Sequence, residues 1–155
     1  MKKFLFSAIV ACFCFVMNAQ ALNPQQTKLR DDIQSFLNEE GFRAEIDSDG
    51  DIKFKREGLT WFVVMSSTDV DPMFIVLMRM HPYGEKITKE NLTPILNEIN
   101  SWKGVKIYLG EKSYSYRAEL YVNSAEPFKA AFYKLASQID NMSSDVISIL
   151  SNANK

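Results

Sequence analysis

Residues 42–65 read Phe42-Arg-Ala-Glu-Ile-Asp-Ser-Asp-Gly-Asp-Ile-Lys-Phe-Lys-Arg-Glu-Gly-Leu-Thr-Trp-Phe-Val-Val-Met65. Apolar and charged residues alternate over 42–46 and 52–56, which is typical of half-buried strands. A three-residue turn at 48–50 would pair Ile46 with Ile52 and Glu45 with Lys53, keeping apolar residues opposite apolar ones. A tight turn at Glu57-Gly58 would then bring Trp61 opposite Phe54. The stretch therefore predicts three consecutive antiparallel strands.

Helical patterns flank these strands. Asn23 and Pro24 favour a helix start, the apolar spacing continues to Leu37, and Gly41 favours its end. Further strands are predicted over 73–81, 105–109 and 114–122, with a loop over 66–72. A helix is expected over 88–102, its regular part beginning near Thr93 because of Pro94. A final helix follows Ser124, with a bend expected near 141–144. The order α-β-β-β-β-α-β-β-α predicts an α+β fold, a mostly antiparallel sheet with helices packed on one face.

The first 21 residues have the features of a secretion signal. Lys2 and Lys3 precede an apolar run, and Ala19-Gln-Ala21 offers small residues where a signal peptidase cleaves. The run, about 14 residues long, is shorter than the roughly 20 needed for a stable membrane span. We therefore expect residues 1–21 to be a signal peptide, residues 22–155 to form one domain, and the protein to be exported to the periplasm or the extracellular space. Lipid attachment at Cys12 is a minor alternative.

Cleavage would remove 21 of the 155 residues, leaving 134, and both cysteines would go with the signal. Two of the 18 basic residues would also leave, so 16 basic residues would face 19 acidic ones. Without thiols the domain must be held by an apolar core, for which its length is adequate. The mild negative charge argues against nucleic acid as a partner, because phosphate contacts require clustered Lys and Arg.

The chain resembles the YbjN family, which shares the fold of type III secretion chaperones. The resemblance rests on Gly41-Phe42 after the first helix, on the hairpin from Ile46 to Gly58, and on Ile95-Leu-Asn-Glu-Ile-Asn100 leading into Val105-Lys-Ile-Tyr-Leu109. It implies a module that holds a partner polypeptide, usually as a dimer. Members are labelled as candidate regulators of sensory transduction. The family has no catalytic residues to carry over, and the export signal departs from its pattern.

Candidate chemical sites are weak. Asp47, Asp49 and Asp51 resemble part of a calcium loop, but the glycine spacing and the missing terminal Glu do not match. His81 is the only histidine, so neither a zinc site nor a nucleophilic triad has its usual partners. Asp69 and Asp71 fit a turn before Pro72. We expect no metal, no cofactor and no enzymatic activity, with a hydrolase using Asp69, Asp71 or His81 as the remote alternative.

The most informative pattern is apolar residues on both faces of the middle strands. The face away from the predicted core is polar on the outer strands, but on the third and fourth strands it is predicted to carry Phe62, Val64, Met73, Ile75 and Leu77, beside Arg79 and His81. Either a loop or the final helix covers these residues, or they dock a polypeptide or a second copy of the chain. The alternative function is a small-molecule or lipid carrier, with Phe74, Met78, Met80 and Trp102 lining a pocket between helices and sheet.

Overall fold

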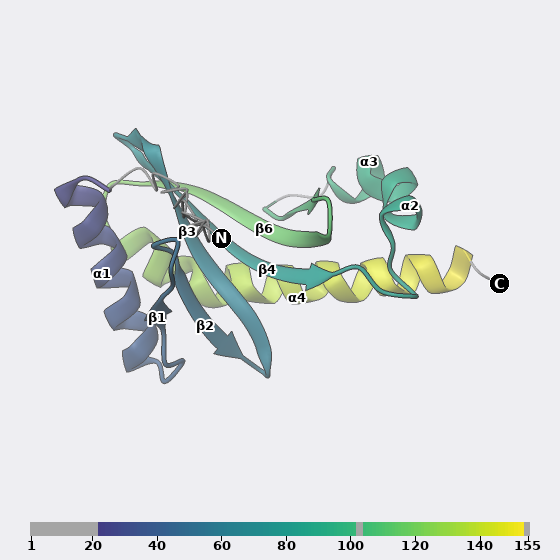
Figure 1. Ribbon diagram of the computed structural model, residues 1–155, viewed down its shortest axis with the longest axis horizontal. Helices are drawn as coiled ribbons and strands as arrows, with labels where there is room; N and C mark the ends of the chain where they lie inside the picture. Colours follow the sequence, from purple (N-terminus) through teal and green to yellow (C-terminus); the bar gives the residue numbers. More distant parts are fainter. Residues whose placement is uncertain (1–21, 102–103, 154–155) are drawn as a thin grey trace, which may run out of the picture.

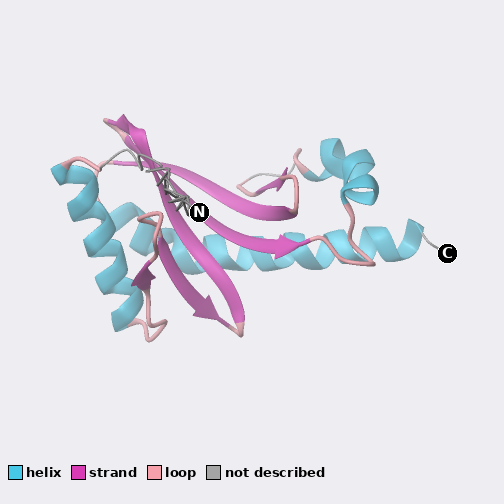
Figure 2. Cartoon of the chain, in the orientation of Figure 1, coloured by secondary structure: helices cyan, strands magenta, loops and turns pink. Residues whose placement is uncertain are grey.

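A six-stranded antiparallel sheet carries both long helices on one face in the computed structural model, which describes residues 22–101 and 104–153 (Figures 1 and 2). The sheet order is β1-β2-β3-β4-β6-β5. The elements are α1 (Pro24–Glu39), β1 (Glu45–Ile46), β2 (Ile52–Arg56), β3 (Leu59–Val70), β4 (Met73–Pro82), α2 (Lys89–Leu92), the 3₁₀ turn η1 (Thr93–Ile95), α3 (Leu96–Ile99), β5 (Lys106–Leu109), β6 (Ser113–Val122) and α4 (Glu126–Ala153). The predicted α+β fold and element order are confirmed. The signal-peptide prediction, Cys12 and Trp102 lie outside the described residues.

The register of the first three strands follows the alternation in the sequence. Ile46 lies opposite Ile52, and Phe54 lies opposite Trp61, as predicted. Gly50 takes a φ of +88° in the turn, a conformation open to glycine and costly for other residues. The first strand is shorter than predicted. The side-chain amide of Asn38 contacts both the N–H and the C=O of Ala44, and these bonds replace pairing with β2 there.

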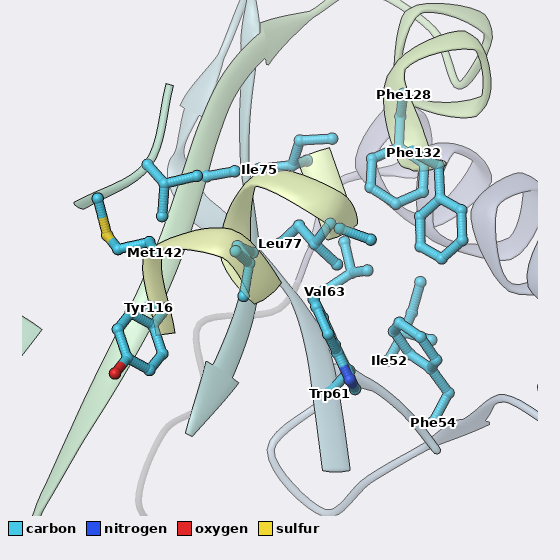
Figure 3. Packing of buried hydrophobic residues seen from close by; sticks show 14 of the residues in the cluster. Ile52, Phe54, Trp61, Val63, Ile75, Leu77, Tyr116, Phe128, Phe132 and Met142 are labelled. Carbon is cyan, nitrogen blue, oxygen red and sulfur yellow. The ribbon is translucent and has the colours of Figure 1, made fainter. Parts of the chain in front are cut away.

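The core lies between the sheet and the helices α1 and α4. Phe54 and Trp61 stack at 6.3 Å between ring centroids, and Phe132 of α4 lies 6.0 Å from Phe54. Phe36 of α1 meets Phe132 edge-on at 5.7 Å, so both helices converge on the same aromatic cluster. Figure 3 shows Phe54, Trp61, Phe128 and Phe132 of this cluster. Trp61 and Phe132 are fully buried. Burial of this kind contributes roughly 1.5–3 kcal/mol per large side chain and holds the fold without disulfides.

The predicted loop over 66–72 is wrong, because β3 continues to Val70 and forms a bulge. The β3–β4 pairing changes register between the pairs Met65–Ile75 and Val70–Met73. The hydroxyl of Ser66 and the carboxylate of Asp69 bond each other inside the bulge at 2.6 Å. Buried Gln26 of α1 donates its side-chain N–H to the Ser66 carbonyl at 2.8 Å. Local hydrogen bonds and one helix residue therefore hold an irregularity that strand periodicity does not reveal.

The two later helical segments differ from their predictions in opposite ways. The expected helix over 88–102 is broken into α2, η1 and α3, and Pro94 lies in the 3₁₀ turn. The final helix, in contrast, continues without interruption through 141–144, where a bend was expected. No helix in the described part of the chain is both long enough and apolar enough to cross a membrane.

Gln26→Ala should lower the free energy of unfolding by about 1–3 kcal/mol, because it leaves the Ser66 carbonyl without its partner and removes half of the capping box with Asn23. Urea denaturation followed by circular dichroism measures the loss. The neighbouring exposed Gln25 is the matched control, and Gln25→Ala should change stability by less than about 0.5 kcal/mol. Equal effects of the two substitutions would contradict a role for Gln26 in holding the bulge.

Candidate functional site

The placement of Met73, Ile75 and Leu77 on the second sheet face is wrong, since all three are buried on the core face. Leu77 lies opposite Val63, and Ile75 lies opposite Met65, so odd-numbered residues of the two strands share a face. The bulge explains the error. The register slips there by an odd number of residues, and such a slip exchanges the two faces of a strand. Arg79 and His81 follow the same parity and also lie on the core side.

The structure instead brings even-numbered residues of β4 to the second face, beside the correctly placed Phe62 and Val64. Phe62 lies opposite Met78, and Val64 lies opposite Val76. We call the set Phe62, Val64, Phe74, Val76 and Met78 the apolar stripe. None of its members belongs to the core cluster or to the partly buried residues packed against it. Tyr121 of β6 extends the stripe at one end, where its ring lies 4.9 Å from that of Phe74 and its side chain is 65% exposed.

Charged residues border the apolar stripe on both sides. One row across the sheet reads Glu45, Lys53, Phe62, Met78, Arg117 and Lys106, taking one residue from each strand in spatial order. Lys53 pairs with Glu45 at 3.2 Å on the surface. On the other border, the guanidinium of Arg117 stacks over the Tyr108 ring at 4.3 Å. The second face is thus apolar in its middle and predominantly cationic at its edges.

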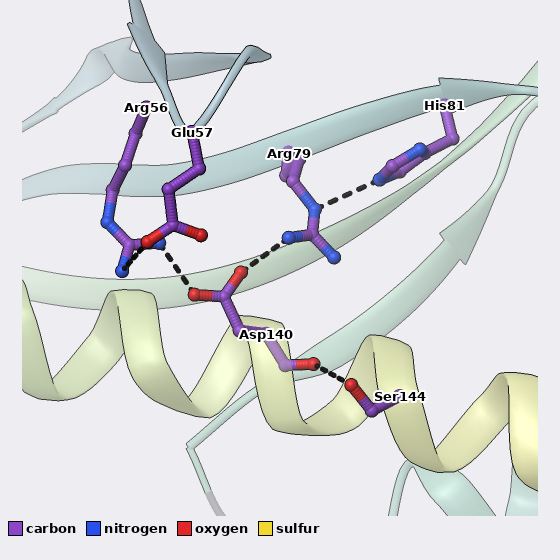
Figure 4. A network of polar contacts seen from close by, with 6 residues as sticks. All are labelled: Arg56, Glu57, Arg79, His81, Asp140 and Ser144. Atoms are coloured by element: carbon purple, nitrogen blue, oxygen red, sulfur yellow. Dashed lines mark hydrogen bonds and ion pairs between the residues drawn. The ribbon is translucent and has the colours of Figure 1, made fainter.

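A network of polar side chains ties α4 to the core face of the sheet (Figure 4). Asp140 of α4 accepts hydrogen bonds from Arg56 at 2.6 Å and from Arg79 at 2.5 Å. The Arg79 side chain is only 5% exposed, and its guanidinium lies 5.4 Å from the Trp61 ring centroid. Such a buried cation requires its counter-charge, so Asp140 fixes the position of α4 over the sheet.

His81 is the acceptor at the end of this network. The Nε–H of Arg79 donates to His81 Nε2 at 2.9 Å, which requires an unprotonated Nε2. Burial, and secondarily the positive charge of Arg79, lowers the pKa of His81 below its ordinary value, in agreement with that role. Asp71 precedes β4 and His81 lies near its end, about 30 Å apart along an extended strand. The structure therefore does not bring the hydrolase candidates Asp69, Asp71 and His81 together.

The acidic turn is organised by its own backbone. Asp47 Oδ1 accepts the backbone N–H groups of Asp49 and Asp51 at 3.0 and 3.1 Å. Burial, followed by the charges of Asp47 and Asp49, raises the pKa of Asp51 to about 6. Within residues 22–101 and 104–153, no three His, Cys, Asp or Glu side chains are arranged to hold a metal ion.

Two surface hollows flank the sheet. One, of about 330 Å³, adjoins β1 and β2 and is lined by Arg43, Glu45, Lys53, Lys55, Phe54 and neighbours. The other, of about 610 Å³, lies between Ile87 and Asn91 on one side and Ile147 and Leu150 of α4 on the other. Neither lies between the helices and the sheet. The residues predicted to line a carrier pocket there, Phe74, Met78 and Met80, belong to the second face by register.

Asp140→Asn should lower the free energy of unfolding by about 2–3 kcal/mol, since it leaves the buried Arg79 guanidinium without a counter-charge. Chemical denaturation measures the loss. Asp145→Asn, an exposed change on the same helix, should be nearly neutral. Adding Arg79→Met to Asp140→Asn should recover part of the stability, and a further loss would contradict this account of the network.

Asp51→Asn should stabilise the protein by about 1 kcal/mol at pH 8, a value reduced for the partial exposure of the side chain. Because the folded protein binds the Asp51 proton more tightly than the unfolded chain, this carboxyl lowers stability as pH rises from the unfolded value of 3.8 through about 6. Urea midpoints compared between pH 4 and pH 8 test this. The difference between variant and wild type should vanish near pH 4, and a difference independent of pH would refute it.

Comparison with known proteins yields a match in fold alone. No family model matches the chain, and no curated protein does. The crystal structure of YbjN from E. coli, described as a candidate transcription regulator, superposes with a TM-score of 0.55 at 18% sequence identity. The match covers 80% of this chain and 91% of YbjN. The resemblance read from the sequence is thus confirmed at the level of the fold: the chain adopts a YbjN-like α+β architecture.

Proposed function

We propose that the protein is an exported, non-enzymatic binding module that docks a polypeptide, or a second copy of itself, on the apolar stripe. The main observation in support is that Phe62, Val64, Phe74, Val76 and Met78 form an apolar set apart from the core cluster. Export rests on the signal features of residues 1–21. The binding role is supported by the YbjN-like fold and by the stripe itself.

The stripe is not required to complete the core. α1 and α4 pack on the other face of the sheet, where Trp61, Val63 and Leu77 are already fully buried. Residues on the second face of the flanking strands β2 and β6 are mostly charged, as expected for a solvated surface. An apolar pair of strands between charged ones is therefore best explained by a partner, since Phe62, Val64 and Phe74 remain partly exposed and a partner that covers them would remove that apolar area from water.

A polypeptide suits this surface better than an enclosed small molecule. The space between helices and sheet is filled by aromatic side chains, and the residues expected to line a carrier pocket lie on the second face instead. A two-strand-wide apolar surface with polar borders has the layout of a protein interface, with an apolar centre and a charged rim.

Phe62→Lys should leave folding intact and abolish docking. Docking is measured in two ways: sedimentation equilibrium for self-association, and fluorescence anisotropy with a permanently unfolded polypeptide, reduced and carboxymethylated α-lactalbumin. Both are run at about 0.3 M NaCl so that general charge attraction is screened. We expect the wild type to show at least one of the two, and the variant to lose it by at least about tenfold in affinity.

The adjacent residue provides the control. Val63 is fully buried on the core face, so Val63→Lys should unfold the protein, whereas Phe62→Lys should keep the wild-type circular dichroism spectrum. A Phe62→Lys protein that unfolds would show that the stripe is core. A wild-type protein that neither self-associates nor binds the unfolded chain would also contradict the proposed function.

A further inference from the structure

We infer that the occupant of the apolar stripe is an amphipathic helix of a partner polypeptide, with acidic residues along both borders of its apolar face. This inference rests on the proposed function and specifies the partner. Its basis is the charge and the spacing of the residues that border the stripe.

The charge of the second face differs in sign from that of the chain. The described strands place Lys53, Lys55, Lys106 and Arg117 on this face, against the carboxylates of Glu45 and Glu119. The whole chain, in contrast, has 18 basic and 19 acidic residues. Glu119 accepts a hydrogen bond from the Tyr108 hydroxyl at 2.7 Å, and Lys106 donates to the Asn100 carbonyl. The remaining cations Lys53, Lys55 and Arg117 lie on opposite borders of the stripe.

The hollow beside β1 and β2 adds positive charge to one of these borders. Its lining includes three cations, Arg43, Lys53 and Lys55, and one acid, Glu45. The Lys53–Glu45 pair is exposed on both sides, and a pair of that kind contributes at most about 1 kcal/mol. A partner carboxylate can therefore exchange for Glu45 at little cost, while the hollow gives its side chain room.

The width of the stripe matches a helix. Lys53 on β2 and Arg117 on β6 are separated by β3 and β4, which amounts to three strand spacings, or about 14 Å. A helix with its side chains is about 10–12 Å across, so Glu side chains at both edges of its apolar face reach both borders. From Phe74 through Met78 to Met80, the next residue of β4 on this face, the apolar run is about 20 Å long, the length of a helix of about 14 residues.

The exposure of the side chains favours a helix over a flat surface as the partner of the stripe. Val76 and Met78, in the middle of the stripe, are 7% and 9% exposed, whereas the Lys53 side chain at the border is 41% exposed. The charged side chains at the border are thus more exposed than the apolar centre. A helix that fits between the borders can reach the apolar centre, whereas a lipid bilayer would meet the charged side chains first.

The test uses two synthetic helical peptides of about 14 residues with the same Leu-rich apolar face. One carries Glu along both borders and the other carries Lys. At about 50 mM NaCl we expect the Glu-bordered peptide to bind at least about tenfold more tightly, with the difference shrinking at about 0.5 M NaCl. The double variant Lys53→Glu/Arg117→Glu should reverse the preference. Lys28→Glu/Lys134→Glu, which makes the same change in net charge on exposed helix positions, should not.

The outcomes separate this inference from the proposed function. Equal affinity for both peptides, or reversal by the control pair, overturns the acidic-helix inference; if Phe62→Lys still weakens both peptides, the docking role stands. Binding to phosphatidylcholine vesicles with about one quarter phosphatidylglycerol, without binding to either peptide, overturns it in favour of a membrane surface. Failure of both peptides together with loss of the unfolded-polypeptide and self-association signals overturns both proposals.

Discussion

The register between β3 and β4 determines which side chains of the sheet face the helices. These are the two central strands, and they are apolar at every position over 61–65 and 73–78, so either face of either strand could serve the core there. The bulge between Met65 and Val70 selects one arrangement: Trp61, Val63, Ile75 and Leu77 face the helices, and the apolar stripe faces away. Gln26 links this choice to α1 through the Ser66 carbonyl. A helix residue and a strand irregularity thus determine together which apolar side chains lie on the second face.

The two faces of the sheet differ in whether their positive charges are paired within the molecule. On the core face, the guanidinium groups of Arg56 and Arg79 both pair with the Asp140 carboxylate and lie over the Trp61 ring. Their positive charges are therefore compensated within the molecule. On the second face, the cations are spread along two borders and meet solvent. Charge that is paired in the interior cannot attract a ligand, whereas charge at the borders of an apolar surface can steer one. The proposed docking role therefore rests on the second face.

The sequence predicts the pairing of the first three strands well, but it does not predict which residues of β4 face the core. The Phe42–Met65 stretch could be assigned to the residue, because alternation and a glycine turn leave one register that keeps apolar residues together. The same reasoning placed Phe62 and Val64 correctly on the second face. It failed for Met73, Ile75 and Leu77 because β4 has no alternation to read, and because the bulge is held by tertiary bonds. Phe74, Val76 and Met78 were missed for the same reason. An apolar middle between polar outer strands was also predicted from the sequence, although with the wrong residues of β4 in that middle.

The second-face residues of β2 differ in character from those of β3 and β4, which form the apolar stripe. All six strands contribute to one sheet, yet on its second face β2 places Lys53 and Lys55 while β3 and β4 place Phe62, Val64, Val76 and Met78. Folding stability does not require this difference, because the core cluster is complete without these residues. Nor does strand propensity, because Thr or a charged residue is compatible with a central strand whose outer face is wet. An apolar centre flanked by cations in one row remains to be explained, and the acidic amphipathic helix that we propose as the partner would account for both parts of the row together.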